Sequence, residues 1–235
     1  MTDNYLLGSA VRAFSGHEFR TPMTAIIGLA NIMHETAGKI SVEEQKELTH
    51  HILTSAQHLM NASLRVSTWY ELTNNRIENK EMFTVTADQL LQMVKDSGES
   101  QLCTGEFFSF HQGTEKLYIS GNEMVLVMAL KELFNNAFKF AKKGTVVSFS
   151  VLEENRHYKI IIKNISDKVK SFDFDKYTVF TQFDRHFYEQ QGLGLGLEIA
   201  RLGITLCQGT YTMSATVAND DNFNVRCEIN LPVPE

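Results

Sequence analysis

The sequence predicts a helical hairpin followed by an α+β sandwich, in which one layer of helices packs on one sheet. The hairpin rests on two long runs with apolar residues at helical spacing, separated by a short turn at residues 38–41. The sandwich rests on short strand-like runs interspersed with amphipathic helical segments. A polar stretch at residues 74–80 lacks apolar periodicity, so we expect domains at residues 1–78 and 79–235.

The first helix is expected over residues 3–37, and it contains the polar segment Ser15-Gly16-His17-Glu18-Phe19-Arg20-Thr21-Pro22. Pro22 lacks the backbone N–H that would bond the carbonyl of Glu18, so we expect the helix to bend or loosen beyond His17. A neutral imidazole here can act as a nucleophile while Glu18 accepts the proton from its other nitrogen. For an arbitrary His-Glu pair, a solvated surface histidine is the commoner explanation.

The second helix begins after Ser41, a plausible N-cap, and has acids in its first turn, where the helix dipole favours them. Its apolar seam is expected at Leu48, Ile52, Ala56, Leu59, Ser63, Val66 and Tyr70. A single hairpin cannot bury two such stripes, so we expect a homodimer in which two hairpins form a four-helix bundle.

The second domain is expected to alternate short strands with helices. The strands are expected at residues 83–85, 106–110, 116–120, 145–152, 158–163, 209–216 and 223–231, and the helices at 87–95, 122–141 and 193–207. This order predicts largely antiparallel strands in a single sheet under one helical layer.

Composition excludes several classes of function. The chain of 235 residues has a net charge of -6, so it lacks the excess of positive charge that is typical of nucleic-acid-binding proteins. It contains no apolar run long enough to cross a bilayer and no signal-peptide pattern, so we expect a cytoplasmic location without membrane contact. Cys103, Cys207 and Cys227 follow no metal-ligand spacing, and we expect reduced, buried thiols.

One predicted helix carries polar side chains suited to binding a ligand. Glu132, Asn136 and Lys139 lie on adjacent turns of one face, while Leu133 and Ala137 face the core. An amide oxygen can ligate magnesium, a lysine can neutralise a phosphate, and an acid can orient or deprotonate a nearby group. For these three residues alone, a solvated helix face is the commoner explanation.

A glycine-rich turn leads directly into the next predicted helix. Gly192, Gly194 and Gly196 alternate with leucines, and glycine lets backbone N–H groups approach phosphate oxygens at a helix N-terminus. Alone, such a turn could be only a tight connection. Together with the preceding helix, it predicts a site for a magnesium-bound polyphosphate.

These motifs resemble those of sensor histidine kinases. His17-Glu18-Phe19-Arg20-Thr21-Pro22 resembles the family's phosphoacceptor box, S-H-E-L-R-T-P. The two later motifs resemble the asparagine box and second glycine box of the catalytic domain, the Bergerat ATP-binding fold shared with gyrase, the Hsp90 chaperone and MutL. Phe180-Thr181-Gln182-Phe183-Asp184-Arg185 resembles the phenylalanine motif beside the ATP lid. The resemblance covers essentially the whole chain, in the family's order.

The resemblance implies a role for each matching residue. In the first domain it implies His17 as phosphoacceptor, Glu18 as its base and Thr21 as the residue that orients water in a phosphatase reaction. In the second it implies Asn136 as magnesium ligand, Lys139 and Arg185 as nucleotide contacts, Gly192, Gly194 and Gly196 as phosphate cradle, and Glu132 at the place of a general base.

The first glycine box departs from the family pattern D-x-G-x-G. Asn164 stands where the aspartate would bind the adenine amino group, and Ser166 and Lys168 replace the glycines. Because Asn164 offers a neutral acceptor in place of a charged one, we expect weak rather than absent ATP binding.

The resemblance implies a protein-histidine kinase that uses ATP and Mg²⁺. It would phosphorylate His17, pass the phosphoryl group to an aspartate of a response-regulator receiver domain, and possess phosphatase activity. Two alternatives remain open at this point: a pseudokinase scaffold that uses no ATP, and an ATP-independent phosphotransfer module.

Overall fold

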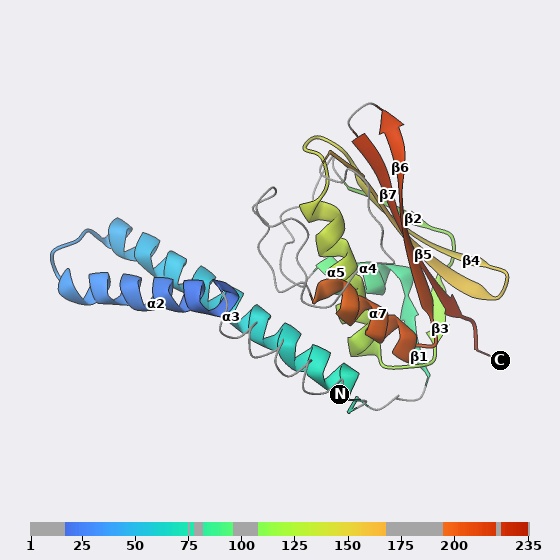
Figure 1. Cartoon of the computed structure of the whole chain (residues 1–235), viewed down its shortest axis with the longest axis horizontal. Coiled ribbons are helices and arrows are strands. Elements are labelled where there is room, and N and C mark those ends of the chain that lie inside the picture. The colour runs from blue at the N-terminus through green and yellow to red at the C-terminus, as the bar shows by residue number, and fades with distance from the viewer. Residues whose placement is uncertain are drawn as a thin grey trace, which may run out of the picture. The chain divides into compact units, whose positions relative to one another are not determined.

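The computed structural model describes residues 17–74, 76–77, 82–95, 108–167, 195–219 and 222–234. The chain forms two compact units (Figure 1). One contains a helical hairpin, and the other contains two β-sheets with the helices that pack on them. No helix in the described part of the chain is both long enough and apolar enough to cross a lipid bilayer.

The hairpin consists of α2 (His17–Glu35) and α3 (Val42–Thr73), and the remainder of the first predicted helix, residues 3–16, lies outside the described residues. Ser41 and Glu44 form a capping box at the start of α3. The Glu44 carboxylate accepts from the Ser41 backbone N–H at 2.8 Å, and the Glu44 N–H donates to the Ser41 hydroxyl at 3.2 Å. These bonds to Ser41 hold the pKa of the Glu44 carboxyl below its ordinary value. The predicted N-cap is therefore confirmed.

The predicted seam of α3 is correct in part. Leu48, Ile52, Leu59 and Val66 turn inward, whereas the exposed Ala56, Ser63 and Tyr70 are replaced in the seam by the preceding residues Ser55, Ala62 and Trp69. The observed positions alternate steps of four and three from Leu48 to Trp69. This regular 3.5-residue spacing keeps one stripe facing inward, and the predicted second step of four breaks it.

The elements of the second unit are, in chain order, β1 (Phe83–Thr86), α4 (Ala87–Lys95), β2 (Phe108–Gln112), β3 (Lys116–Ile119), α5 (Glu123–Lys139), β4 (Val147–Glu154), β5 (His157–Ser166), α7 (Gly196–Leu206), β6 (Thr210–Asn219) and β7 (Asn222–Pro232). Five of the strands form a mixed sheet in the order β2-β4-β5-β7-β6. The other two, β1 and β3, form a separate antiparallel pair.

The prediction of a single sheet is therefore wrong, although every predicted strand and helix of this unit is present. β2 pairs with β4 in parallel, while the remaining pairs in the larger sheet are antiparallel. β2 and β4 are separated in the chain by β3 and α5, which together make the crossover that a parallel pair requires.

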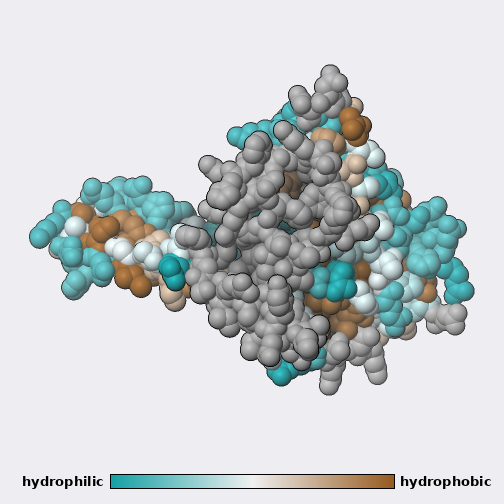
Figure 2. Space-filling view, in the orientation of Figure 1, coloured by the Kyte–Doolittle hydropathy of each residue, from teal (hydrophilic) through white to brown (hydrophobic). Residues whose placement is uncertain are grey.

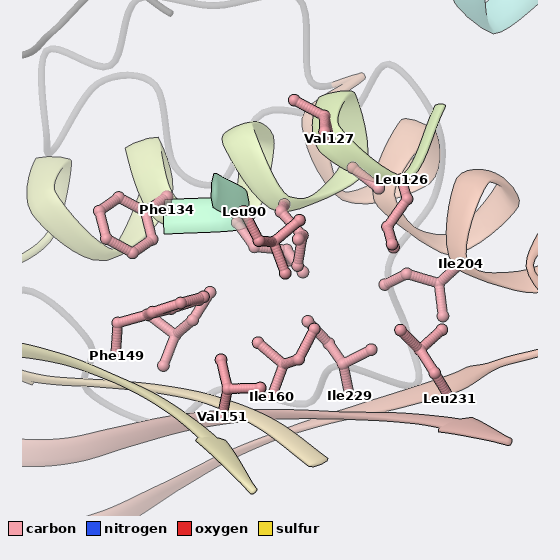
Figure 3. Packing of buried hydrophobic residues seen from close by; sticks show 14 of the residues in the cluster. Leu90, Leu126, Val127, Phe134, Phe149, Val151, Ile160, Ile204, Ile229 and Leu231 are labelled. Atoms are coloured by element: carbon pink, nitrogen blue, oxygen red, sulfur yellow. The ribbon is translucent and has the colours of Figure 1, made fainter. Parts of the chain in front are cut away.

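The hydrophobic core lies between the five-stranded sheet and its helices (Figure 3). Phe149 and Val151 of β4 and Ile160 of β5 point from the sheet toward Phe134 and Leu126 of α5. Along β5, alternate residues share this face, in the order Tyr158, Ile160, Ile162, Asn164 and Ser166. The first three belong to the apolar core, so the row turns polar toward the end of the strand.

Helices α5 and α7 approach closely in antiparallel orientation. A Cβ added to Gly203 of α7 would lie 3.0 Å from Val125 Cγ1 and 3.1 Å from Ala129 Cβ of α5. Toward the N-terminus of α7, a Cβ on Gly196 would lie 2.6 Å from Glu132 Oε2. Close packing at Gly203 therefore fixes the position of Gly196 beside Glu132.

Two of the three predicted thiols lie in this unit and are buried and free, while Cys103 lies outside the described residues. Burial raises the pKa of the Cys227 thiol to about 12 and that of Cys207 above its ordinary value. Both groups are therefore protonated and unreactive at neutral pH.

Gly121 immediately precedes the Asn122 N-cap of α5 and has a φ of +144°. Its missing Cβ would lie 2.9 Å from the backbone Cα of Cys207. Gly121→Ala should therefore destabilise the unit by about 3 kcal/mol, through backbone strain together with overpacking. Chemical denaturation followed by circular dichroism measures this loss.

Gly144→Ala is the matched control for Gly121→Ala. Gly144 has a φ of +80°, and no described atom of the surroundings would lie within 4 Å of a Cβ added there. Only the left-handed backbone penalty applies, about 1 kcal/mol. Equal losses in the two variants would show that the Cys207 contact at Gly121 contributes nothing.

Candidate functional site

The two phosphate-related motifs of the sequence meet in the structure. Gly196 is the first residue of α7, and its Cα faces the carboxylate of Glu132 on α5 closely enough that a Cβ would collide with Oε2. Glycine allows this approach, whereas any larger residue at position 196 would displace the Glu132 carboxylate. The carboxylate thus lies beside a helix N-terminus, where the macrodipole favours negative charge.

The first turn of α7 carries a second acid whose charge is neutralised locally. Glu198 accepts two hydrogen bonds from Arg201, at 2.8 Å from Nε and 2.6 Å from Nη2. This bidentate pair raises the pKa of the Arg201 guanidinium. Because Glu198 is paired in this way, its charge opposes an anion at the helix N-terminus less than a lone carboxylate would.

The C-terminal turns of α5 present the remaining polar residues of the predicted face. Asn136 is partly buried and Lys139 is exposed, whereas Leu133 and Ala137 are buried in the core, as the sequence predicts. The turn after α5 reaches the end of β5, where the backbone N–H of Lys142 donates to the carbonyl of Ile165 at 2.7 Å. Asn136 and Lys139 therefore lie at the same end of the unit as the polar end of β5.

Asn164 occupies the core-facing row of β5 and is only 6% exposed. Its amide nitrogen Nδ2 is buried and has no hydrogen-bond partner among the described residues. Leaving such a donor unsatisfied costs about 1–3 kcal/mol, so a buried asparagine amide of this kind is suited to meet an acceptor on a ligand.

Ser166 lies two residues further along the same row and is fully buried. Positive φ angles of non-glycine residues in the described chain fall at Asn155, Arg156 and Gln208, so Ser166 continues the strand as extended backbone. Serine in place of the family's glycine therefore introduces no backbone strain here. The strand predicted over residues 158–163 stops short of Asn164 and Ser166, which share its core face. Polar residues two apart after an alternating strand are the signal in the sequence that indicates this continuation.

Several predicted site residues cannot be placed in this arrangement. Arg185, Gly192, Gly194 and Lys168 lie outside the described residues. In the hairpin unit, the backbone of His17 and Glu18 begins α2, and Thr21 is exposed one turn later on the same helix. Pro22 lies inside α2, which continues to Glu35 as a helix.

Comparison with known proteins identifies both units. Residues 15–62 match the His Kinase A (phospho-acceptor) domain, and residues 121–235 match the histidine kinase-, DNA gyrase B-, and HSP90-like ATPase domain. The chain carries the transmitter domains of a sensor histidine kinase. The second unit of this transmitter is accordingly an ATP-binding domain of that family.

Curated relatives agree with this assignment of the transmitter. Sensor histidine kinase YvrG of Bacillus subtilis is 23% identical over 205 residues, which cover 85% of this chain and 34% of the relative. Heme sensor protein HssS of Staphylococcus epidermidis is 25% identical over 221 residues, covering 79% and 47% respectively. The transmitter thus spans less than half the length of these relatives.

Solved structures share the fold of the transmitter. Histidine kinase AdeS of Acinetobacter baumannii superposes with a TM-score of 0.62 at 16% identity, covering 94% of this chain and 99% of that one. Full-length ShkA in complex with AMPPNP gives 0.63 at 19% identity, covering 96% and 45%.

Proposed function

We propose that the transmitter phosphorylates itself on His17 with ATP and passes the phosphoryl group to an aspartate of a response-regulator receiver domain. The observation that best supports this is the contact between Gly196 and the Glu132 carboxylate. It joins the two polyphosphate motifs within the domain that also holds the buried Asn164 amide, which has no partner among the described residues. We assign residues 1–78 to the dimerisation and phosphotransfer domain and 79–235 to the catalytic domain.

The residues of the motifs suit a nucleotide in several respects. The N-terminus of α7 supplies backbone donors for phosphate oxygens beside Gly196, and Gly192 and Gly194 precede it in the same motif. Lys139 supplies an exposed cation, and the Asn136 oxygen is a suitable ligand for Mg²⁺, which neutralises phosphate charge when bound. Arg185 contributes a further cation, and Asn164 binds the adenine base of ATP.

His17 acts as the nucleophile in the proposed reaction. One imidazole nitrogen forms a bond to the γ-phosphorus of ATP while the bond from that phosphorus to the bridging oxygen breaks, and ADP leaves with the electron pair. Glu18 accepts the proton from the other ring nitrogen. Glu132 orients groups beside the phosphates. In a separate phosphatase reaction, Thr21 orients the water that hydrolyses the regulator's aspartyl phosphate.

The hairpin is proposed to form a homodimer. Its exposed apolar side chains, each between 46% and 60% exposed, include Met23, Ile27 and Ile32 on α2 and Leu53, Met60 and Leu64 on α3. Figure 2 shows hydrophobic residues on the surface of this unit. Leu53, Met60 and Leu64 are spaced by seven and four residues, which places them on one stripe of α3. A second copy of the hairpin would bury these side chains in a four-helix bundle.

Calorimetric titration of the full chain with Mg·ATP tests this function against both alternatives. We expect saturable binding that weakens when EDTA removes the metal, because phosphate charge is then left less compensated. A pseudokinase scaffold or an ATP-independent phosphotransfer module would give no binding heat at millimolar ATP.

Two glycines of α7 separate a binding role from a packing role. Gly196→Ala should cause little loss of stability, because the Glu132 carboxylate ends a flexible side chain and can move aside. The same variant should weaken ATP binding about tenfold, because its methyl group would lie at the assigned phosphate cradle. Gly203→Ala should instead destabilise the domain by about 1–3 kcal/mol, since its neighbours are the Val125 and Ala129 side chains and the Val125 backbone carbonyl.

Gly196 begins α7 and Gly203 lies inside it, so the gain in helix propensity from alanine applies mainly to Gly203→Ala and opposes the loss expected there. The melting temperature and the ATP dissociation constant are measured for each variant. A Gly196→Ala variant that loses stability but keeps its ATP affinity would contradict the assignment of Gly196 to the phosphate cradle.

A further inference from the structure

Asn164 presents a hydrogen-bond donor that an aspartate at the same position would lack. Its Nδ2 is buried and has no hydrogen-bond partner among the described residues, although the residue is only 6% exposed. A carboxamide offers one acceptor and two donors on adjacent atoms, whereas an ionised carboxylate only accepts. The substitution therefore adds a donor to the buried end of the site.

Adenine carries a complementary pair of groups along its edge. The 6-amino group donates, and a ring nitrogen on either side of it, N1 or N7, accepts. Asparagine pairs with adenine through two such bonds in other settings, with its oxygen accepting from the amino group and its nitrogen donating to a ring nitrogen.

We propose that Asn164 binds adenine through two hydrogen bonds, donating from Nδ2 to ring nitrogen N1 and accepting from the 6-amino group. This inference rests on the proposed ATP-binding function. N1 is chosen over N7 because Asn164 lies buried on the core face of β5, whereas the triphosphate must reach the N-terminus of α7 at Gly196. The edge containing N1 is the part of the base farthest from the ribose.

The expected bond is stronger than an exposed hydrogen bond of the same type. Nδ2 is already shielded from solvent in the folded chain, so binding the base removes no water from it. Losing the N1 acceptor should therefore weaken binding by about tenfold, toward the upper end for neutral hydrogen bonds.

The test compares three nucleotides on the wild-type chain by calorimetry. 1-Deaza-ATP replaces N1 by C–H and keeps the amino group, and 7-deaza-ATP makes the same change at N7. We expect 1-deaza-ATP to bind about tenfold more weakly than ATP and 7-deaza-ATP to bind within about twofold of it. Equal affinity of ATP and 1-deaza-ATP, or a loss confined to 7-deaza-ATP, would overturn the proposal.

Asn164→Asp supplies the matched protein variant. A carboxylate oxygen facing the N1 lone pair is repelled by it, so the variant should bind 1-deaza-ATP at least as tightly as ATP. Persistence of the wild-type preference for ATP in Asn164→Asp would count against the donor role of Nδ2. If the variant does not fold, the wild-type comparison still decides. Absence of any ATP binding to the wild type would instead refute the proposed function itself.

Discussion

Replacing His17 with glutamine is expected to abolish phosphoryl incorporation from Mg·ATP. Glutamine keeps a polar side chain of helix-compatible size, but its amide nitrogen is not a nucleophile, so the phosphorus–nitrogen bond cannot form. Incorporation is measured with γ-labelled ATP on the full chain. ATP affinity should stay unchanged, because His17 is assigned to the other domain from the nucleotide site.

His34→Gln is the matched control, since His34 is an exposed histidine on the same helix α2. It should keep wild-type labelling. Glu18→Gln should slow labelling by about a hundredfold without changing ATP affinity, because only proton transfer is lost. Labelling that persists in His17→Gln would move the acceptor to another residue.

Replacing Asn136 with alanine is expected to eliminate ATP binding detectable by calorimetry. Asn136 is the assigned metal ligand on the polar face of α5, and without it the phosphate charge loses the Mg²⁺ that compensates it. Because the residue is only partly buried, the domain should remain folded, which a thermal melt establishes.

Asn135→Ala provides the control for this variant. Asn135 is the adjacent asparagine of α5 and is also partly buried, but it points in another direction around the helix. Its replacement should leave ATP affinity within about twofold of the wild type. Equal losses in the two variants would indicate general damage to α5 and would remove the support for Asn136 as a metal ligand.

Local features of the fold were predictable because they depend on neighbouring residues. Helical periodicity correctly assigned Leu133 and Ala137 to the core and left Glu132 and Asn136 on the other face of α5. The Ser41 cap was predictable for the same reason. In the α3 seam, Leu59 and Val66 were predicted correctly but Ala56 was predicted in place of Ser55. Ser55 and Ala56 are both small, so composition alone does not separate them.

Pairing between distant segments was not predictable in this way. Nothing in the residues of β2 indicates that it joins β4 in parallel or that β1 and β3 form a separate sheet, because these pairings depend on the path of the whole chain. The close approach of Gly196 to Glu132 and the burial of the Asn164 amide likewise arise only when the helices pack on the sheet.

The chemical stability of the phosphoryl label on the wild-type chain tests the central claim most directly. After incubation with γ-labelled Mg·ATP, the protein is divided between acid and base before the retained label is counted. A phosphohistidine contains a phosphorus–nitrogen bond, so the label should be lost in acid and retained in base. A label that survives acid, or no label at millimolar ATP, would contradict ATP-dependent autophosphorylation of His17.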